Sequence, residues 1–263
     1  MARIVITGST RGIGLGMARE FRARGHDVVI SSRGQSAVDG AVAELAAAPG
    51  SGRVVGIACD VGDRAAVQAL WDGAADRLGG VDIWINNAGL TGPKRDVSSL
   101  TDPDIAPVIA ANIWGMIHGT QIPLAGMTAQ GSGKIFNFEG FGSDGMTAPG
   151  LSIYGMTKRA LTYFTTSVNK EIKGSPVLLG TISPGIVVTD LLEESRDADP
   201  VKWQKTKRMY NILADKVETV APFIVERVLA ADRPGTAIRW LTTGKAARRF
   251  LLQPFVKRQV LDN

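Results

Sequence analysis

Tyr154 and Lys158 lie four residues apart in a stretch with a helical pattern, so their side chains would share one helix face. A phenol has an unperturbed pKa of about 10 and is a poor acid at neutral pH. A neighbouring ammonium group stabilises the phenolate and lowers that pKa, which would let Tyr154 exchange a proton with a substrate oxygen. Because many surface helices carry this pair of residues, its meaning depends on the rest of the sequence.

A glycine-rich segment follows the first apolar run and precedes a helical pattern. Glycines at such a turn let the backbone approach a pyrophosphate, and the N–H groups that begin the helix attract its negative charge. The segment therefore predicts a dinucleotide site, with the candidate residues Gly8, Ser9, Thr10, Arg11, Gly12, Ile13 and Gly14.

The cofactor's ribose should lie at the end of the second strand, where an acidic residue would select NAD. The sequence has Ser32 and Arg33 there, and Arg33 with Arg11 could pair with a 2′-phosphate, which favours NADP. Asp60, followed by Val61, comes after the third strand. Asp60 could meet the adenine amino group, or it could cap the next helix.

Short apolar runs alternate with longer helical patterns along the whole chain. We expect strands at 4–6, 28–30, 54–57, 83–85, 135–138, 178–182 and 238–241, and helices at 13–24, 37–47, 64–78, 104–127, 153–172 and 219–231. The strands lack polar alternation, as in strands buried on both faces. The pattern predicts an α/β fold, a single Rossmann-type doubly wound parallel sheet of about seven strands with helices on both faces.

We expect one domain over residues 1–263, with a substrate loop at 190–216 and a basic amphipathic tail at 244–263. The apolar and basic residues of the tail could lie on an anionic membrane surface. Alternatively, and more usually for an amphipathic helix, the tail would dock its apolar face on the body of the protein.

Composition excludes several classes of protein. The chain has one cysteine, Cys59, and two separated histidines, His26 and His118, so we expect no disulfide and no metal. The net charge of +5 comes from dispersed basic residues without a nucleic-acid-binding signature. No apolar stretch is long enough to span a bilayer, and the first strand begins next to Met1, so we expect a cytoplasmic protein.

Taken together, the motifs resemble those of the short-chain dehydrogenase/reductase family over nearly the whole chain. The matching stretches are 7–14, 86–89, Asn112, Tyr154 with Lys158, and 183–189. The resemblance implies an NADPH-dependent oxidoreductase in which Tyr154 is the acid, Lys158 lowers its pKa and binds the ribose, and Asn112 holds a relay water. Asn112 could also be a helix residue that is satisfied locally. The resemblance further implies cofactor contacts from Asn87, Ala88, Gly89, Pro184, Gly185, Ile186 and Thr189.

One segment departs from the family pattern. A serine usually follows the fifth strand and binds the substrate oxygen, whereas this chain has Gly140 and Phe141 there. Ser143 is the nearest hydroxyl and could take that role, or it could be a turn residue.

The segments 136–143, 188–192, 209–212 and 218–221 resemble chlorophyll b reductases, which reduce a formyl group on a chlorin. This resemblance implies a bulky apolar carbonyl substrate. The alternatives are a 3-oxoacyl thioester or small-ketone reductase and a non-catalytic NADP-binding sensor. The apolar surplus of helices 104–127 and 153–172 and the family resemblance predict a homodimer or homotetramer.

Overall fold

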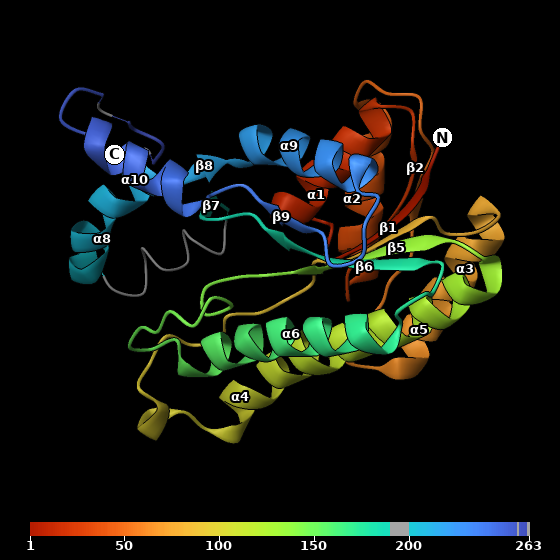
Figure 1. Ribbon diagram of the computed structural model, residues 1–263, viewed down its shortest axis with the longest axis horizontal. Coiled ribbons are helices and arrows are strands. Elements are labelled where there is room, and N and C mark those ends of the chain that lie inside the picture. The colour runs from red at the N-terminus through yellow and green to blue at the C-terminus, as the bar shows by residue number, and fades with distance from the viewer. Residues whose placement is uncertain (190–199, 257, 262–263) are drawn as a thin grey trace.

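The protein is built on a seven-stranded parallel sheet with the strand order β3-β2-β1-β4-β5-β6-β9 (Figure 1). The computed structural model describes residues 1–189, 200–256 and 258–261. The strands are β1 (Arg3–Thr7), β2 (Asp27–Ser31), β3 (Val54–Gly56), β4 (Ile83–Asn86), β5 (Gly133–Phe138), β6 (Val177–Ser183) and β9 (Ala237–Arg239). This arrangement confirms the predicted doubly wound α/β fold.

The strand order reverses at β1, which lies between β2 and β4. Ile4 of β1 is paired with Val28 of β2 on one side and with Ile83 of β4 on the other. The connections that leave β1 and β4 therefore run to opposite sides, and they open a crevice at the carboxyl ends of these strands. Ligands of open α/β sheets bind in such a crevice.

Helices cover both faces of the sheet and bury its apolar side chains (Figure 1). One face is covered by α1 (Gly12–Ala23), α2 (Gln35–Ala47) and α9 (Val217–Ala230). The other is covered by α3 (Arg64–Leu78), α5 (Gly115–Gln130) and α6 (Ser152–Glu171). Continuous apolar strands such as Ile4-Val5-Ile6, all fully buried, are stable only between two such layers.

The predicted helix at 104–127 is wrong in one respect, because it is not continuous. After a short 3₁₀ helix, η1 (Val97–Ser99), the segment consists of α4 (Asp102–Ile109), a π-helical turn, η2 (Ala110–Trp114), and α5. A π-turn displaces the helical hydrogen-bond ladder by one residue and is frequent at functional sites. Here it contains Asn112.

The expected loop at 190–216 is partly regular structure. Residues 190–199 lie outside the described residues, but α8 (Pro200–Leu213) and β8 (Asp215–Lys216) follow, and β8 pairs with β7 (Val187–Val188). The tail forms α10 (Thr243–Leu252), which lies beside α8 at one end of the molecule (Figure 1).

The expectation that the tail docks its apolar face on the body is wrong. The large apolar side chains Phe250, Leu251, Leu252, Phe255 and Val256 are exposed, whereas Leu261 near the end of the tail is buried. Arginines of the same segment make polar contacts with the body. No helix within the described part of the chain is both long and apolar enough to cross a membrane.

Candidate active site

The glycine-rich turn between β1 and α1 is held against the end of β4. Gly8 has a φ of 63°, and a Cβ atom on it would lie 2.7 Å from Ala88 Cα. Gly12 has a φ of 56°, and a Cβ there would lie 3.3 Å from Thr189 Cγ2. Both positions thus require glycine for backbone conformation, and the missing side chains leave the backbone open to a ligand.

Two side chains fasten this turn to the strand ends. Thr7 Oγ1 accepts hydrogen bonds from the N–H groups of Asn87 and Ala88, both at 3.1 Å. The Asn87 side-chain amide donates to the carbonyls of Thr7 at 2.9 Å and Gly8 at 2.8 Å. Gly14 is needed to leave room for this amide, since a Cβ atom on it would lie 2.6 Å from Asn87 Nδ2. The sequence places Thr7 in the motif 7–14 without assigning it a role, because that role appears only when the two strand ends meet.

Ser9 positions the turn rather than offering a donor to a ligand. It is fully buried, its N–H donates to the Ser31 carbonyl at 3.0 Å, and its hydroxyl donates to the Ile6 carbonyl at 2.6 Å. At the end of β2, Ser32 Oγ is buried without a hydrogen-bond partner among the described residues, and Arg33 is exposed. The residues predicted to bind the ribose phosphate follow the carboxyl end of β2, which is paired with the end of β1 at Ser31 and Thr7.

Asp60 was expected either to contact the adenine amino group or to cap the next helix, and the structure excludes the cap. Asp63 is the residue that caps α3, and its carboxylate accepts from the Ala65 N–H at 2.8 Å. Asp60 instead accepts from the Gly62 N–H at 2.9 Å, which forms a turn before the helix. The role of helix cap thus belongs to Asp63, and the proposed adenine contact of Asp60 stays open.

Tyr154 and Lys158 project from the first two turns of α6 toward the crevice. Lys158 Nζ lies 5.8 Å from the centroid of the Tyr154 ring and donates to the Phe138 carbonyl at 2.8 Å. Burial raises the pKa of Tyr154 to about 12, and burial lowers the pKa of Lys158 to about 8. The pKa of the phenol is thus raised and not lowered as expected, because desolvation of the phenolate outweighs the effect of an ammonium at this distance.

The Asn112 side chain is satisfied within the protein. Its amide oxygen accepts from the Leu90 N–H at 2.8 Å, and its amide nitrogen donates to the Leu90 carbonyl at 2.8 Å and to Thr157 Oγ1 at 3.0 Å. These bonds join η2, the loop after β4 and α6. The alternative of a helix residue that is satisfied locally thus describes the side-chain contacts of Asn112.

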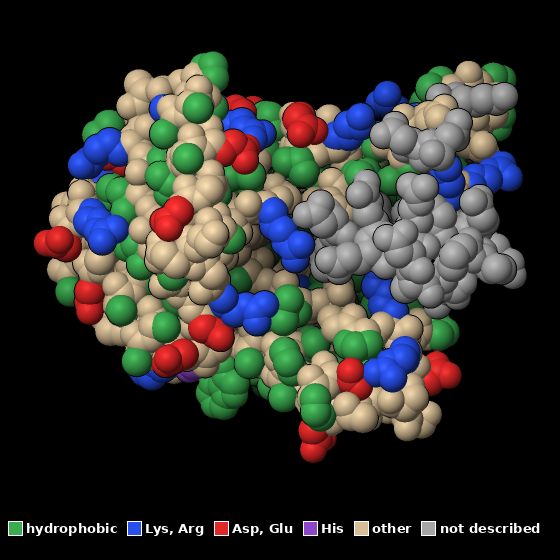
Figure 2. All heavy atoms as spheres, turned by 180° about the vertical axis from the view of Figure 1, so that it is seen from behind, with side chains coloured by type: hydrophobic (Ala, Val, Ile, Leu, Met, Phe, Trp, Pro, Cys, Tyr) green, Lys and Arg blue, Asp and Glu red, His purple; other side chains and the backbone are tan. Residues whose placement is uncertain are grey.

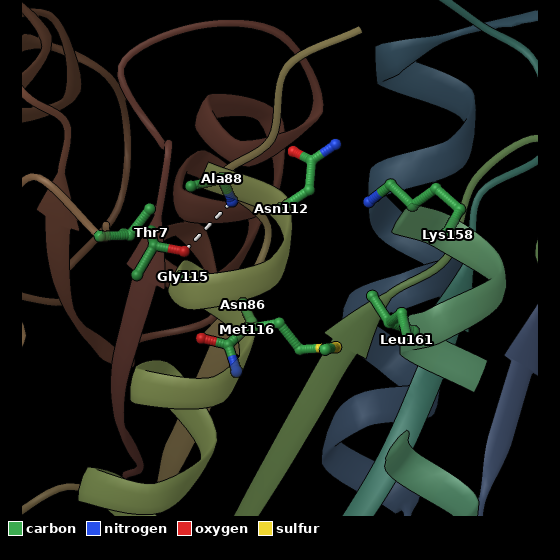
Figure 3. A pocket seen from close by; sticks show the side chains of 9 residues that line it. Thr7, Asn86, Ala88, Asn112, Gly115, Met116, Lys158 and Leu161 are labelled. Carbon is green, nitrogen blue, oxygen red and sulfur yellow. Dashed lines mark hydrogen bonds between the residues drawn. The ribbon is translucent and has the colours of Figure 1, made fainter. Parts of the chain in front are cut away.

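A narrow cavity lies between the carboxyl end of the sheet and α6 (Figure 3). Its volume is about 10 Å³, close to the space that one water molecule needs. Lys158 extends from α6 toward Asn112 at this cavity (Figure 3). The lining residues are Thr7, Val61, Asn86, Ala88, Asn112, Gly115, Met116, Lys158 and Leu161. The site can therefore hold a water beside the lysine.

Asn86 is a second motif residue to which the sequence assigned no role. Its amide oxygen accepts from Trp84 Nε1 at 2.8 Å, and its amide nitrogen donates to the Gly119 carbonyl and to Asn137 Oδ1, both at 2.8 Å. Asn137 in turn donates to Thr165 of α6 at 3.0 Å. This buried network fixes α6 against β4, β5 and α5. The sequence signal for such a network is a polar residue, Asn86, at the end of an otherwise apolar strand.

The segment after β5 differs from the family pattern in its geometry as well as in its sequence. A Cβ atom on Gly140 would lie 2.3 Å from the Tyr154 hydroxyl and 3.2 Å from Lys158 Cε. Ser143 Oγ accepts from the Gly140 N–H at 3.1 Å and donates to the Lys158 carbonyl at 3.2 Å. The hydroxyl of Ser143 thus fastens the loop to α6. The residue next to the phenol hydroxyl is Gly140, whose lack of a side chain leaves space there.

The predicted cofactor residues after β6 reach the same crevice. Gly185 has a φ of 71°, and Thr189 approaches Gly12 across the opening. Gly89 approaches Asn112 and Lys158, because its Cβ would lie 3.1 Å from Asn112 Oδ1 and 3.7 Å from Lys158 Nζ. In the described part of the chain, no three His, Cys, Asp or Glu side chains are grouped as metal ligands would be.

Comparison with known families gives one match, a model described as short chain dehydrogenase, over residues 2–200. The chain is 39% identical over 255 residues to the probable chlorophyll(ide) b reductase NYC1 of Arabidopsis thaliana, covering 91% of this chain and 50% of that protein. It is 36% identical over 255 residues to the chlorophyll(ide) b reductase NOL of Oryza sativa subsp. japonica, covering 94% and 73%. The chain thus spans about half the length of the NYC1 proteins that it matches.

Solved structures share the fold. Levodione reductase superposes with a TM-score of 0.82 at 24% identity, covering 93% of this chain and 97% of the other. A serine dehydrogenase complexed with NADP⁺ gives 0.77 at 24% identity, covering 92% and 95%.

The expectation of a cytoplasmic protein is contradicted. The NYC1 and NOL relatives of two plant species are all named as chloroplastic. The expectation rested on the closeness of the first strand to Met1, and that position carries no information about the compartment.

Proposed function

The chain belongs to the short-chain dehydrogenase family, and we propose that it is an NADPH-dependent carbonyl reductase whose acid is Tyr154. The observation that carries this proposal is that Lys158, one helical turn from Tyr154, lines the same cavity as Thr7 and Ala88, which join the glycine-rich turn to the end of β4. The proposed substrate is a bulky apolar molecule with a formyl or keto group, as in the chlorophyll(ide) b reductases that the chain resembles.

The residues present fit a nicotinamide dinucleotide. Gly8 and Gly12 keep the turn free of side chains, and Ser32 has a buried hydroxyl that no described residue binds. Arg11 and Arg33 would hold the 2′-phosphate, and the N–H groups at the start of α1 would face the pyrophosphate. Thr189 and the neighbouring segment would border the nicotinamide, with Pro184, Gly185 and Ile186. When bound, the cofactor supplies the hydride.

In the proposed reaction, Tyr154 donates its proton to the carbonyl oxygen as negative charge develops there. Lys158, which is held by the Phe138 carbonyl, stabilises the phenolate that remains. A water in the cavity next to Lys158 and Asn112 would return the proton from solvent. Gly140 leaves room beside the phenol, which suits a carbonyl attached to a large group.

Turnover with a panel of carbonyl compounds tests the proposed activity. The purified protein should oxidise NADPH in the presence of chlorophyllide b and shift the visible spectrum of the pigment. A protein that reduces only acetoacetyl thioesters or small ketones would instead match the 3-oxoacyl-[acyl-carrier-protein] reductase of Synechocystis sp., to which the chain is 30% identical over 200 residues.

A binding-only NADP sensor is a further candidate, because Gly140 stands where the family has its serine. Such a protein would bind NADPH and turn over no member of the panel.

Cofactor choice is tested separately by titration. Arg33→Ala should weaken NADP by about 1–3 kcal/mol, the scale of a charge-assisted contact, and leave NAD nearly unchanged. An equal loss of affinity for NADP and NAD would show that Arg33 does not bind the 2′-phosphate.

A further inference from the structure

The C-terminal helix α10 is attached to the protein by its polar side. Arg249 donates to the Leu213 carbonyl at 2.8 Å and pairs with Asp215 at 2.8 Å. Arg258 pairs with the other oxygen of Asp215 at 2.6 Å. Lys245 Nζ lies 3.0 Å from the centroid of the Trp240 ring. A helix of a soluble protein usually does the opposite and turns its charged face to water.

The apolar side of this segment faces away from the body. Leu251 is 75% exposed and Phe255 is 85% exposed. Arg248, Leu251 and Leu252, all exposed, follow the spacing i, i+3 and i+4 of one face of α10, and Phe255 is exposed in the turn that follows the helix. Phe250 and Val256 extend the same exposed cluster. We call these six residues, Arg248, Phe250, Leu251, Leu252, Phe255 and Val256, the tail face.

The segment that carries the tail face is basic. Residues 233–261 include seven Lys or Arg residues and no Asp or Glu. Two of the seven, Arg249 and Arg258, are paired with Asp215, so the segment keeps an excess of positive charge after these ion pairs are formed. Hydrophobic and basic side chains are visible on the lobe at the right-hand end of Figure 2.

We propose that the tail face is a docking surface for an anionic lipid bilayer. An amphipathic segment with large apolar side chains on one side and cations around them binds at the boundary between headgroups and acyl chains. The charge is complementary to acidic headgroups and would repel a second basic tail. The anchoring of α10 through Asp215 holds this face outward, so the lipid contact needs no rearrangement of the protein.

Sedimentation with vesicles tests this proposal without any substrate, so its outcome is independent of the proposed reductase activity. The full chain should sediment with vesicles of phosphatidylcholine and phosphatidylglycerol, much less with phosphatidylcholine alone, and less as salt is added. Leu251→Ser combined with Phe255→Ser should lower the partition coefficient about tenfold or more. Val97→Ser, which removes an exposed apolar side chain elsewhere, should leave it unchanged.

The contribution of charge to vesicle binding is tested with a second pair of variants. Arg248→Gln should weaken binding to the anionic vesicles several-fold, on the order expected for one cation near a charged surface. Lys173→Gln, at another exposed position, should not. Two results would overturn the proposal: wild-type protein that stays in the supernatant with anionic vesicles, or a Leu251→Ser, Phe255→Ser variant whose vesicle binding is intact. A change in solution mass without a change in vesicle binding would assign the face to a second copy of the chain.

Discussion

Burial shifts the two ionisable groups of the proposed acid pair in opposite directions, because it disfavours the charged form of each. The phenol of Tyr154 is therefore neutral at every ordinary pH and carries the proton that reduction needs, although its raised pKa makes it a weaker acid than a free phenol. Lys158, with a pKa of about 8, is still mainly charged at neutral pH. The pair is thus arranged to give a proton to a substrate.

The Lys158 shift predicts a pH dependence of stability. Its pKa falls from the ordinary value of 10.5 to about 8 in the folded protein. Between these values the unfolded chain binds the proton and the folded protein does not. The free energy of unfolding should therefore gain up to about 3 kcal/mol from this group as pH rises through the window.

Chemical denaturation of wild type and Lys158→Met across this pH range measures the gain as a difference. Lys245 has a similarly lowered pKa but is present in both proteins, so its contribution cancels. If the difference in unfolding free energy between wild type and Lys158→Met did not change with pH, the lowered pKa of Lys158 would be contradicted.

Gly140 is predicted to be more important for turnover than Ser143. In Gly140→Ala the new methyl group would lie 2.3 Å from the Tyr154 hydroxyl, so the phenol must move. Displacement of a catalytic group by about 1 Å can cost on the order of 100-fold in rate, and we expect a loss of that size in kcat. Cofactor affinity should change little.

Ser143→Ala is the comparison for this variant. Its hydroxyl fastens the loop, so the change should lower thermal stability and reduce kcat less than Gly140→Ala does. A loss of about 100-fold in a stably folded Ser143→Ala would instead make this hydroxyl the donor to the substrate carbonyl.

At the scale of elements, Asp215 of β8 holds the tail to the body. This buried carboxylate accepts from Trp240 Nε1 at 2.7 Å and pairs with Arg249 and Arg258. Asp215→Ala leaves two guanidinium groups without their anion and should cost about 3–5 kcal/mol, the loss typical of a broken buried pair.

Thermal unfolding and limited trypsin digestion check this prediction, with faster cleavage in the tail of the variant. Asp232→Ala is the control, because its pair with Arg233 is exposed and should contribute little. Equal stability of the two variants would show that Asp215 does not anchor the tail.

Elements with strong local patterns could be predicted from the sequence, and those that depend on tertiary contacts could not. The strand at 4–6 and the helix at 64–78 are defined by their own side chains, and the structure has both. The π-turn at Asn112 carries no local signal, since its residues are compatible with an α-helix. The orientation of α10 could not be predicted either, because it depends on Asp215, about 30 residues earlier in the sequence.

The site residues likewise divide into those whose role the sequence predicts and those whose role depends on tertiary contacts. Tyr154, Lys158 and the turn glycines have a spacing that, with the rest of the sequence, predicts their roles. Thr7 and Asn86 lie in the same motifs, but they act through residues far along the chain, so the sequence assigns them no role.

At the scale of the whole molecule, large side chains are exposed on the outer surface of η2 and α6. Trp114 is 51% exposed, and Met156 and Tyr163 are 52% and 77% exposed. Exposed apolar clusters of this kind mark interfaces, and closed symmetric assembly is the usual result. We predict a homodimer or homotetramer in solution.

Sedimentation equilibrium at micromolar concentrations measures this state. Trp114→Asp combined with Tyr163→Asp should shift the mass to that of the monomer, while Val97→Asp should not. Wild-type protein that is monomeric throughout would contradict the prediction.

The central claim is that Tyr154 gives the proton in carbonyl reduction. Single-turnover oxidation of NADPH on an accepted aldehyde, compared between wild type and Tyr154→Phe, tests it most directly. The ring remains in the variant and only the exchangeable proton is lost. The account predicts a rate lower by about 100- to 10,000-fold with unchanged NADPH affinity. A variant that keeps a rate close to that of wild type would show that another group is the acid.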